Sequence, residues 1–368
     1  MEVSRRDTLP LLATGLAATA GGAARAQYAA ADPAVPIKAH LGVTENPFGP
    51  SPAARLAIRH SVRDAAYYPH SEKPLLDRIV AREGIRAEQV TLASGSLDAL
   101  SHLSVGLGRG GRILAPQPTY STHLAYAARQ GVETDWVPLG RDHQIDLAAM
   151  LAAIGPQTRL VYLCNPNNPT GLLLDPAALH AFCIEASKRV PVMIDEAYFE
   201  LAPDPLRHSV ANLVREGHDV IVARTFSKVY GLAGFRIAYI LAQPERVRLL
   251  KSLVTTSRNQ AGLAAATVCL GDAAYLAGAI AYLKDCRSRI YRIAEDNKLV
   301  FLPSEGTFVY LNCGMPGKDM QARLARLGVE VRLFEGAAYA NWIRIGTAIP
   351  AELAHFAAAL PKALAAAG

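Results

Sequence analysis

Short apolar runs alternate with helical segments from residue 89 to about residue 240, and this alternation limits the folds that the chain can adopt. Runs such as residues 160–164 and 220–223 have the length and residue types of strands that are buried on both faces. Sequential strand–helix units favour an α/β fold in which a mostly parallel sheet is sandwiched by helices. Hydrophobic residues make up 51% of the 368 residues, which is enough for a core of that kind.

The pattern changes after residue 243. Two helices and a longer third one come first, then short strands with a further helix among them, and an Ala-rich helix closes the chain. This mixture predicts a second, smaller α+β domain. We therefore expect three parts in the mature chain, namely an extended N-terminal arm (27–50), a large domain (51–250) and a small C-terminal domain (251–368).

The first 26 residues have the pattern of an export signal. Twin arginines (Arg5 and Arg6) precede a short apolar run, and an Ala-Arg-Ala site ends at Ala26. This order predicts a twin-arginine signal peptide, cleavage before Gln27 and a periplasmic or otherwise exported protein. The alternative is an Ala-rich, disordered tail on a cytoplasmic protein.

Charge and metal-binding residue types exclude several classes of function. The net charge of +6 comes from scattered Lys and Arg, without a basic run or an interleaved aromatic platform, which argues against nucleic-acid binding and suits an anionic small substrate. The five cysteines have no CxxC spacing and the ten histidines form no HxxxH pair, so we expect neither a metal centre nor a disulfide framework. After the signal, no apolar run has the length and purity of a membrane span.

A single lysine, Lys228, lies in the connection between two predicted buried strands. Such connections carry reactive groups in α/β enzymes, and a lysine that is desolvated there becomes a nucleophilic amine. The chemistry that suits it is a Schiff base with pyridoxal phosphate (PLP), a cofactor that also needs an anion site and a carboxylate for its pyridine nitrogen. Thr225, Ser227 and Arg236 stand close in sequence and can bind the phosphate. The alternative is a surface lysine in a Gly-containing loop.

Polar residues also follow other predicted strands. Gly95 and Ser96 stand between a strand and a helix, where backbone N–H groups can hold a phosphate, unless Ser96 is only a helix cap. Asn168 lies in a loop that two prolines make rigid and can donate to a phenolate oxygen, although such a turn can also lack chemistry. Asp195 ends a buried strand, where a carboxylate needs a partner such as a protonated pyridine nitrogen, unless it is a helix cap or a metal ligand. All of these residues fall at the edge of the sheet where ligands bind.

Two tyrosines and two arginines complete the set of candidates. Tyr120 opens a helix after a strand and can stack on a planar ring or pack in the core. Tyr198, three residues after Asp195, can reach the oxygen of the same ring. Arg344 lies in the middle of an apolar strand, where a guanidinium requires an anion, and Arg332 could assist it. The alternative for both arginines is a structural ion pair.

In this order and with these gaps, the motifs resemble the fold-type I PLP-dependent aminotransferases (class I/II), most closely the histidinol-phosphate aminotransferase branch. The matching segments span most of the mature chain and are 45–47, 49–50, 68–69, 95–96, 118–120, 167–171, 195–198, 227–236 and 344–346. The resemblance implies PLP as the cofactor, a sheet of the seven-stranded type, and a homodimer with its sites at the interface.

The resemblance also implies roles for the catalytic residues. Lys228 would hold PLP as a Schiff base and move a proton, while Asp195 would keep the pyridine nitrogen protonated. Asn168 and Tyr198 would bind the phenolic oxygen of the cofactor, and Tyr120 would stack on its ring.

The resemblance assigns the remaining candidates to the phosphate and the substrate. The cofactor phosphate would be held by Gly95, Ser96, Thr225, Ser227 and Arg236. Tyr68 would reach the phosphate of the neighbouring subunit. Arg344 would bind the acidic end of the substrate, with Arg332 as a second anion-binding arginine and Asn46 beside them.

The chain departs from the family at two points. Its phosphate loop reads Ala-Ser-Gly-Ser-Leu-Asp (93–98) where the family usually has Gly-Asn-Gly-Ser-Asp-Glu, so that Leu97 replaces an acid. The export signal is the second departure. Histidine biosynthesis is cytoplasmic, so an exported relative need not act on histidinol phosphate.

The sequence therefore predicts a transaminase that moves an amino group between an amino acid or histidinol phosphate and a 2-oxo acid by a ping-pong mechanism. One alternative is a PLP-dependent lyase, racemase or oxidase that uses the same lysine. The other is a catalytically silent, exported binding protein.

Overall fold

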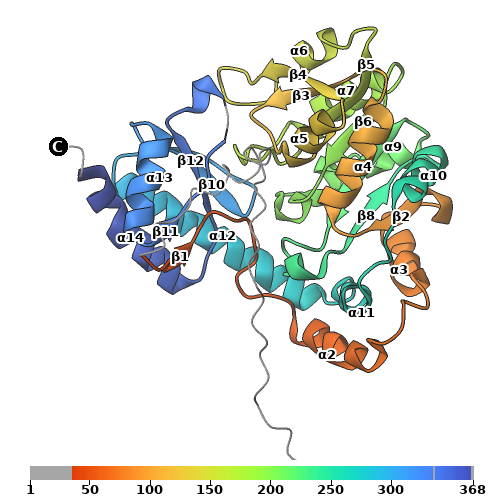
Figure 1. The fold of residues 1–368 in the computed structure, drawn as a ribbon, viewed down its shortest axis with the longest axis horizontal. Coiled ribbons are helices and arrows are strands. Elements are labelled where there is room, and N and C mark those ends of the chain that lie inside the picture. Colours follow the sequence, from red (N-terminus) through yellow and green to blue (C-terminus); the bar gives the residue numbers. More distant parts are fainter. Residues whose placement is uncertain (1–34, 335, 366–368) are drawn as a thin grey trace, which may run out of the picture.

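A seven-stranded sheet forms the centre of the larger part of the molecule (Figure 1). The computed structural model describes residues 35–334 and 336–365, so the expected export signal (1–26) lies outside the described residues. In spatial order the strands are β2 (Val90–Ala93), β8 (Ala238–Leu241), β7 (Val220–Thr225), β6 (Val192–Asp195), β5 (Thr158–Cys164), β3 (Arg112–Gln117) and β4 (Glu133–Pro138). Only β8 runs antiparallel to its neighbours, which confirms the predicted mostly parallel sheet.

Side chains of the sheet alternate between two hydrophobic clusters, one on each face. On β5, Val161 and Leu163 belong to one cluster, and Leu160 and Tyr162 belong to the other. One face is covered by α2 (Pro52–Ser61), α3 (Lys73–Glu83), α6 (Leu147–Ala152), α7 (Pro176–Ala186), α9 (Ala211–Arg215) and α11 (Gln260–Cys269). The other is covered by α4 (Ser96–Gly108), α5 (Thr122–Arg129) and α10 (Pro244–Leu253). Burial on both faces explains why inner strands such as β5 and β6 are mostly apolar, whereas the edge strand β4 is largely exposed and carries polar residues.

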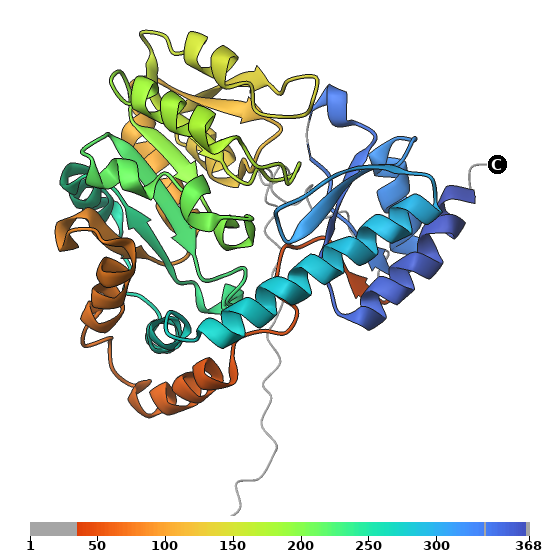
Figure 2. The ribbon, with the colours of Figure 1, turned by 180° about the vertical axis from the view of Figure 1, so that it is seen from behind.

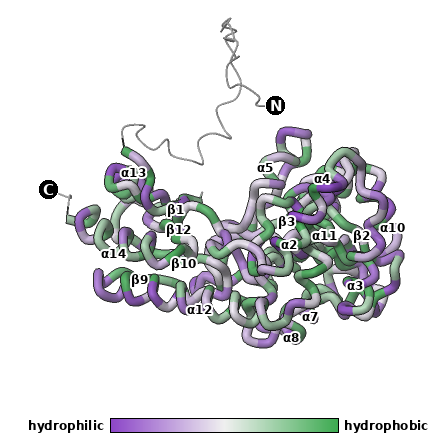
Figure 3. Tube along the Cα trace, turned by 90° about the horizontal axis from the view of Figure 1, so that it is seen from below, coloured by the Kyte–Doolittle hydropathy of each residue, from purple (hydrophilic) through white to green (hydrophobic). Residues whose placement is uncertain are grey.

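A smaller antiparallel sheet organises the C-terminal part. Its order is β12 (Trp342–Gly346), β10 (Phe308–Asn312) and β9 (Val300–Leu302), and its helices are α13 (Gly317–Arg326) and α14 (Pro350–Ala365). The long helix α12 (Ala273–Asp296) runs from the larger part to this sheet (Figure 2). Hydrophilic positions gather along outer helices such as α10 and α12 (Figure 3). The smaller α+β part agrees with the expected fold class, whereas the boundary at residue 250 stays a prediction.

The arm contains a strand that the sequence did not reveal. β1 (Ala39–His40) pairs in parallel with β11 (Val329–Glu330) and ties the arm to the small sheet's side of the molecule. Two residues in a Pro- and Ala-rich stretch give no periodicity, so the strand was invisible in the sequence. The sequence pattern predicts a strand over residues 329–332, but β11 contains only Val329 and Glu330. The short helices α8 (Pro205–His208) and α9 were also missed.

Among the described residues, no single helix is long and apolar enough to cross a membrane. Taken together, α11 and α12 are long and apolar enough to do so, but the two helices are bent by 90° at the break between them.

A buried ion network lies beneath the ends of β6 and β7. The guanidinium of Arg224, whose side chain is 2% exposed, donates to Glu83 at 2.6 Å, to Glu196 at 2.9 Å and to the Ser209 hydroxyl at 2.6 Å. Both carboxylates are buried as well. The network therefore joins α3 to the strand ends that precede the candidate site.

Removing Arg224 should be costly because the buried Glu196 loses its cation and the buried Glu83 keeps only the longer pair with Arg82 at 3.5 Å. We expect Arg224→Ala to lower the free energy of unfolding by about 3–5 kcal/mol. Arg246→Ala is the control, since Arg246 pairs with Asp219 near the surface and its loss should cost less than about 1 kcal/mol. Chemical denaturation of the two variants tests this, and equal losses would contradict the assignment.

Candidate active site

The loops after three neighbouring parallel strands meet at one edge of the large sheet. Cys164 at the end of β5 pairs with Asp195 at the end of β6, and Asp195 pairs with Ala223 near the end of β7. The loops that carry Asn168 and Lys228 leave β5 and β7 at this level. The structure thus brings these candidates to the ligand edge that the strand pattern indicated.

Lys228 is partly buried and its amine is held by the N-terminal arm. Its Nζ donates to the carbonyl oxygen of Thr44 at 2.8 Å and to the Thr44 hydroxyl at 2.7 Å. Burial lowers the pKa of Lys228 to about 8, and the nearby Arg344 acts in the same direction. Asp195 and Glu45 oppose that shift. The neutral, nucleophilic form of the amine is therefore far more populated near neutral pH than it is in an exposed lysine.

Asp195 is buried at the end of β6 and is 2% exposed. Burial raises the pKa of its carboxyl to about 7, against the backbone N–H of Ala197, which donates to it at 3.2 Å, and the charge of Lys228. The carboxyl is neutral below that pH and ionised above it. A cation beside it would hold it ionised at lower pH, which is the partner that the sequence required.

Asn168 and Tyr198 are adjacent, as expected. The amide of Asn168 donates to the Tyr198 hydroxyl at 3.3 Å, and its oxygen accepts from Arg344 at 2.9 Å. The Tyr198 hydroxyl in turn donates to the Thr44 hydroxyl at 3.3 Å. Burial raises the pKa of Tyr198, so its phenol stays protonated and can donate. A chain of hydrogen bonds therefore runs from Asn168 through Tyr198 to Thr44, which also accepts from Lys228.

The residues expected to hold a phosphate come from α4 and from the loop after β7. Gly95 caps the N-terminus of α4 with φ +86°, and a Cβ at this position would collide with the guanidinium of Arg236. Ser96 begins the helix, so the cap is Gly95 rather than Ser96. Thr225 and Ser227 lie together, with their hydroxyl oxygens 2.8 Å apart.

Asp98 and Arg258 hold the phosphate loop in place. Asp98, the acid that remains after Leu97, accepts from the backbone N–H of Ser94 at 3.3 Å and steadies the loop. Arg258, which the sequence reasoning missed, donates to the Leu92 carbonyl at 2.8 Å and to the Ser94 hydroxyl at 3.3 Å. Its position in a polar loop between two helices gave no signal.

Tyr120 and His123 lie behind this edge. Tyr120 is partly buried, and its pKa is raised by burial and by the charge of Asp195, which places the two groups near each other. His123 is fully buried, shares a hydrogen bond with Ser104 at 2.8 Å and meets the ring of Tyr162 edge-on at 4.3 Å. Burial lowers the pKa of His123 to about 3, so its imidazole is neutral.

Arg344 reaches the site from the small sheet. Its guanidinium donates to Asn168 and, at 2.8 Å, to the carbonyl of Gly42, and it lies over the rings of Phe308 and Phe334. Arg332 faces it across an isolated antiparallel bridge, so the two side chains lie on the same face. The structure thus brings the two arginines together, and Arg344 of the pair is hydrogen-bonded to Asn168.

Two candidates lie differently from the rest. The amide nitrogen of Asn46 donates to the Val229 carbonyl at 2.8 Å and its oxygen accepts from Phe48, so its polar atoms hold the loop after Lys228. Tyr68 is 84% exposed and does not reach the site of its own chain. The substrate role of Asn46 and the role of Tyr68 at a neighbouring subunit stay predictions.

Thr44 is the contact that the sequence reasoning missed. It is buried next to Glu45 and Asn46, which belong to a matching motif, but a threonine at the start of that motif has no distinctive signature. Only the fold shows that its oxygens face Lys228.

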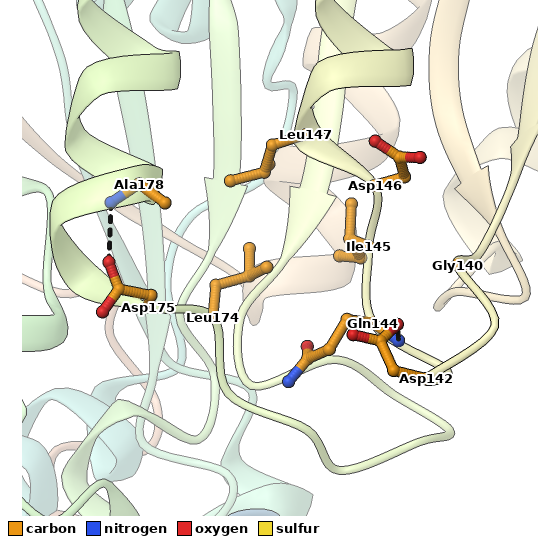
Figure 4. A pocket seen from close by; sticks show the side chains of 9 residues that line it. All are labelled: Gly140, Asp142, Gln144, Ile145, Asp146, Leu147, Leu174, Asp175 and Ala178. Atoms are coloured by element: carbon orange, nitrogen blue, oxygen red, sulfur yellow. Dashed lines mark hydrogen bonds between the residues drawn. The ribbon is translucent and has the colours of Figure 1, made fainter.

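A separate hollow of about 440 Å³ opens between the N-termini of α6 and α7 (Figure 4). Asp142, Asp146 and Asp175 line it, and each accepts a hydrogen bond from a backbone N–H close by in sequence. Their carboxylates therefore serve as turn and helix caps, and the hollow contains none of the candidate residues. Among residues 35–334 and 336–365, no group of three or more His, Cys, Asp or Glu could hold a metal ion.

The donor set at the sheet edge fits PLP. A lysine amine of lowered pKa can bond to its aldehyde, and a buried carboxyl can face its ring nitrogen. Phenol and amide donors suit its ring oxygen. A glycine at a helix N-terminus beside an arginine leaves room and positive potential for its phosphate.

Comparisons with known proteins agree with this reading. The profile of the family described as aminotransferase class I and II matches residues 36–360. The chain is 34% identical over 329 residues to histidinol-phosphate aminotransferase 1 of Cupriavidus pinatubonensis, covering 88% of each chain. It is 36% identical over 339 residues to histidinol-phosphate aminotransferase 2 of Ralstonia nicotianae, again covering 88% of each.

Solved structures give the same result. The histidinol-phosphate aminotransferase of Sinorhizobium meliloti in complex with pyridoxal-5'-phosphate superposes with a TM-score of 0.83 at 32% identity, covering 90% of this chain and 92% of that one. A structure described as a putative histidinol-phosphate aminotransferase from Erwinia carotovora atroseptica gives 0.82 at 29% identity, covering 89% and 95%.

Proposed function

The chain belongs to the class I and II aminotransferases and is a PLP-dependent transaminase, and from that premise we propose that one of its substrates is an amino compound with a phosphate or carboxylate group bound by Arg344 and Arg332. Histidinol phosphate is such a compound, and a 2-oxo acid would be the second substrate. The observation that carries the proposal is the bridge that sets the two arginines side by side, with Arg344 hydrogen-bonded to Asn168.

Bound PLP supplies an electron sink that makes the bond to the α-hydrogen of the amino substrate weak enough to break. Asp195, ionised beside the ring nitrogen, stabilises the positive charge that this sink requires. Lys228 is the group that takes and returns the proton, because its amine titrates near neutral pH and lies at the same sheet edge.

The other residues would orient the cofactor and the substrate and neutralise their anionic groups. Asn168 and Tyr198 would donate to the ring oxygen of bound PLP, and Tyr120 would cover a face of its ring. Gly95 and Ser96 offer N–H groups at the start of α4, and Arg236 offers a cation beside them. The two arginines from the small sheet hold the anionic end of the substrate, so that its amino end is directed toward Lys228.

A half-reaction tests the proposal. Purified protein would be mixed in turn, without acceptor, with histidinol phosphate, glutamate, aspartate and histidinol, which has the amino group of histidinol phosphate but no phosphate or carboxylate. We expect a stoichiometric loss of the absorbance of bound PLP with at least one of the anionic donors and none with histidinol at the same concentration. Conversion by histidinol alone would contradict the proposed anion site without affecting the family assignment.

The two arginines should respond differently according to the anion. We expect Arg344→Ala to lower kcat/KM for every anionic substrate by about 10²-fold or more, because a buried charge pair is lost. Arg332→Ala should do the same for phosphate-bearing donors and change dicarboxylate turnover by less than about threefold. The exposed Arg326→Ala serves as the control. Equal rates in Arg344→Ala and the control would contradict the substrate site.

We also propose a homodimer in which Tyr68 completes the partner's phosphate site. Its support is a row of exposed large apolar side chains along α2 and the segment after it, namely Leu56, Val62, Tyr67 and Tyr68. A dimer interface would remove these apolar side chains from water.

Hybrid dimers test the shared site. Lys228→Ala and Tyr68→Ala chains would each be nearly inactive alone, whereas mixing them yields hybrids with one intact site. Random pairing makes about half of the dimers hybrid, so about a quarter of the wild-type activity should return. No recovery after subunit exchange, or a monomer in sedimentation velocity, would contradict this arrangement.

The export of the enzyme is a further proposal, supported by the twin arginines and the Ala-Arg-Ala site. N-terminal sequencing of native protein from the periplasm should begin at Gln27. Recovery of the uncleaved chain from the cytoplasm alone would contradict it.

A further inference from the structure

We propose that Thr44 is a positioning residue for proton transfer, because its hydroxyl and carbonyl oxygens together receive the amine of Lys228 whenever that amine is not bonded to the cofactor. The proposal rests on the transaminase function but not on the identity of the substrate. It assigns a task to a residue of the N-terminal arm, far in sequence from the strand ends that carry the other groups.

The contacts are short and lie inside the protein. Lys228 Nζ is 2.7 Å from the Thr44 hydroxyl and 2.8 Å from the Thr44 carbonyl, and Thr44 is 8% exposed. The same hydroxyl accepts from the Tyr198 phenol at 3.3 Å. One hydroxyl oxygen thus accepts hydrogen bonds from both the amine of Lys228 and the phenol of Tyr198.

The arm holds Thr44 in place from both sides. On the side of the small sheet, Arg344 donates to the Gly42 carbonyl at 2.8 Å and Thr347 donates to the Glu45 carbonyl at 3.1 Å. On the other side, Asn46 donates to the carbonyl of Val229, the residue after Lys228, at 2.8 Å. Figure 2 shows this segment passing beside the small domain before it continues to α2. The acceptors are therefore fixed before the amine arrives.

Two fixed acceptors decide where the proton points. The amine takes a proton as a neutral base and becomes an ammonium with three N–H groups, then returns one proton, so the cycle is balanced. When the two oxygens of Thr44 accept hydrogen bonds from two of those N–H groups, the third N–H has a single direction. Without the hydroxyl, only the hydrogen bond to the Thr44 carbonyl remains, and the ammonium can rotate about it. The third N–H then points toward the proton acceptor for a smaller fraction of the time.

The hydroxyl also affects the charge of Lys228. An acceptor stabilises the ammonium and raises the pKa of the lysine, whereas burial lowers it to about 8. Thr44→Val keeps the shape of the side chain and removes the acceptor. It should therefore lower the pKa of Lys228 further, while Thr44→Ser should preserve it.

The experiment measures the amine directly in full-length protein from which PLP has been removed. Cyanate carbamylates neutral amines, so its rate at Lys228 against pH, followed by peptide mass spectrometry, gives the pKa of that lysine. We expect Thr44→Val to shift the midpoint downward by about one pH unit. Thr44→Ser and Thr91→Val should both match the wild type, since Thr91 is a buried threonine on β2 outside this site. Thr44→Ala replaces Thr44→Val if the latter does not fold.

The loaded enzyme supplies the second measurement. Thr44→Val should lower kcat about tenfold and leave KM for the donor within about twofold, because positioning and not substrate binding is lost. An unchanged Lys228 midpoint in Thr44→Val and Thr44→Ala would overturn the proposal. So would an equal shift in Thr44→Ser or Thr91→Val, since the hydroxyl at this position would then not be the cause.

Discussion

Lys228→Ala should abolish transamination, with kcat reduced by at least about 10⁴-fold, because one side chain supplies both the nucleophile for the cofactor and the base for proton transfer. The structure supports both roles, because the amine donates a hydrogen bond to the buried Thr44 and burial lowers the pKa of the amine to about 8. The half-reaction with an active donor, followed by stopped-flow absorbance, measures the loss.

A surface lysine provides the control for this result. Lys188 is exposed, lies just after α7 and pairs with Glu185 of that helix, and it should be replaceable by alanine without effect on the rate. Lys228→Ala retaining activity within tenfold of Lys188→Ala would contradict the assignment of the amine as nucleophile and base.

Asp195→Asn should cost about 10²- to 10³-fold in kcat while the fold is retained. Asparagine has the same shape but cannot stay anionic beside the protonated ring nitrogen, so the charge of the electron sink is lost. Asp175→Asn is the matched control, because Asp175 caps α7 and asparagine caps a helix equally well.

The affinity for PLP gives this prediction a pH signature. In the cofactor-free protein the pKa of Asp195 is raised to about 7, so the carboxyl is increasingly neutral below that pH. A cationic ring nitrogen binds the ionised form, hence the contribution of Asp195 to the affinity for PLP should be lost as the pH drops below about 7, separately from the change near pH 8 where Lys228 titrates. Asp195→Asn should weaken binding and remove that slope. A slope unchanged in the variant would show that another group is responsible.

Much of this site was predictable because it is built on strand ends. Asn168, Asp195 and Lys228 each follow an apolar run, and in a parallel sheet those ends must converge, so chain order alone brought them together. Gly95 was predictable for the same reason, since a strand, a small-residue turn and a helix define a phosphate cradle.

The contacts supplied by the arm and the small sheet could not be predicted in the same way. Thr44 meets Lys228 across 184 positions of sequence, and no periodic pattern records that the arm passes over the sheet edge. Asn46 carried a family motif, but the motif did not reveal that its amide holds the loop of Val229. Arg344 was expected to need an anion, and its hydrogen bonds to Asn168 and Gly42 depend on how the small sheet packs.

We expect PLP to be covalently attached to Lys228. Reduction of the purified, PLP-loaded protein with borohydride fixes the attachment, and digestion followed by mass spectrometry locates it. A single phosphopyridoxyl modification should be found on the peptide that contains Lys228, at close to one per chain. Attachment to any other lysine, or loss of all PLP from the reduced and denatured protein, would contradict it.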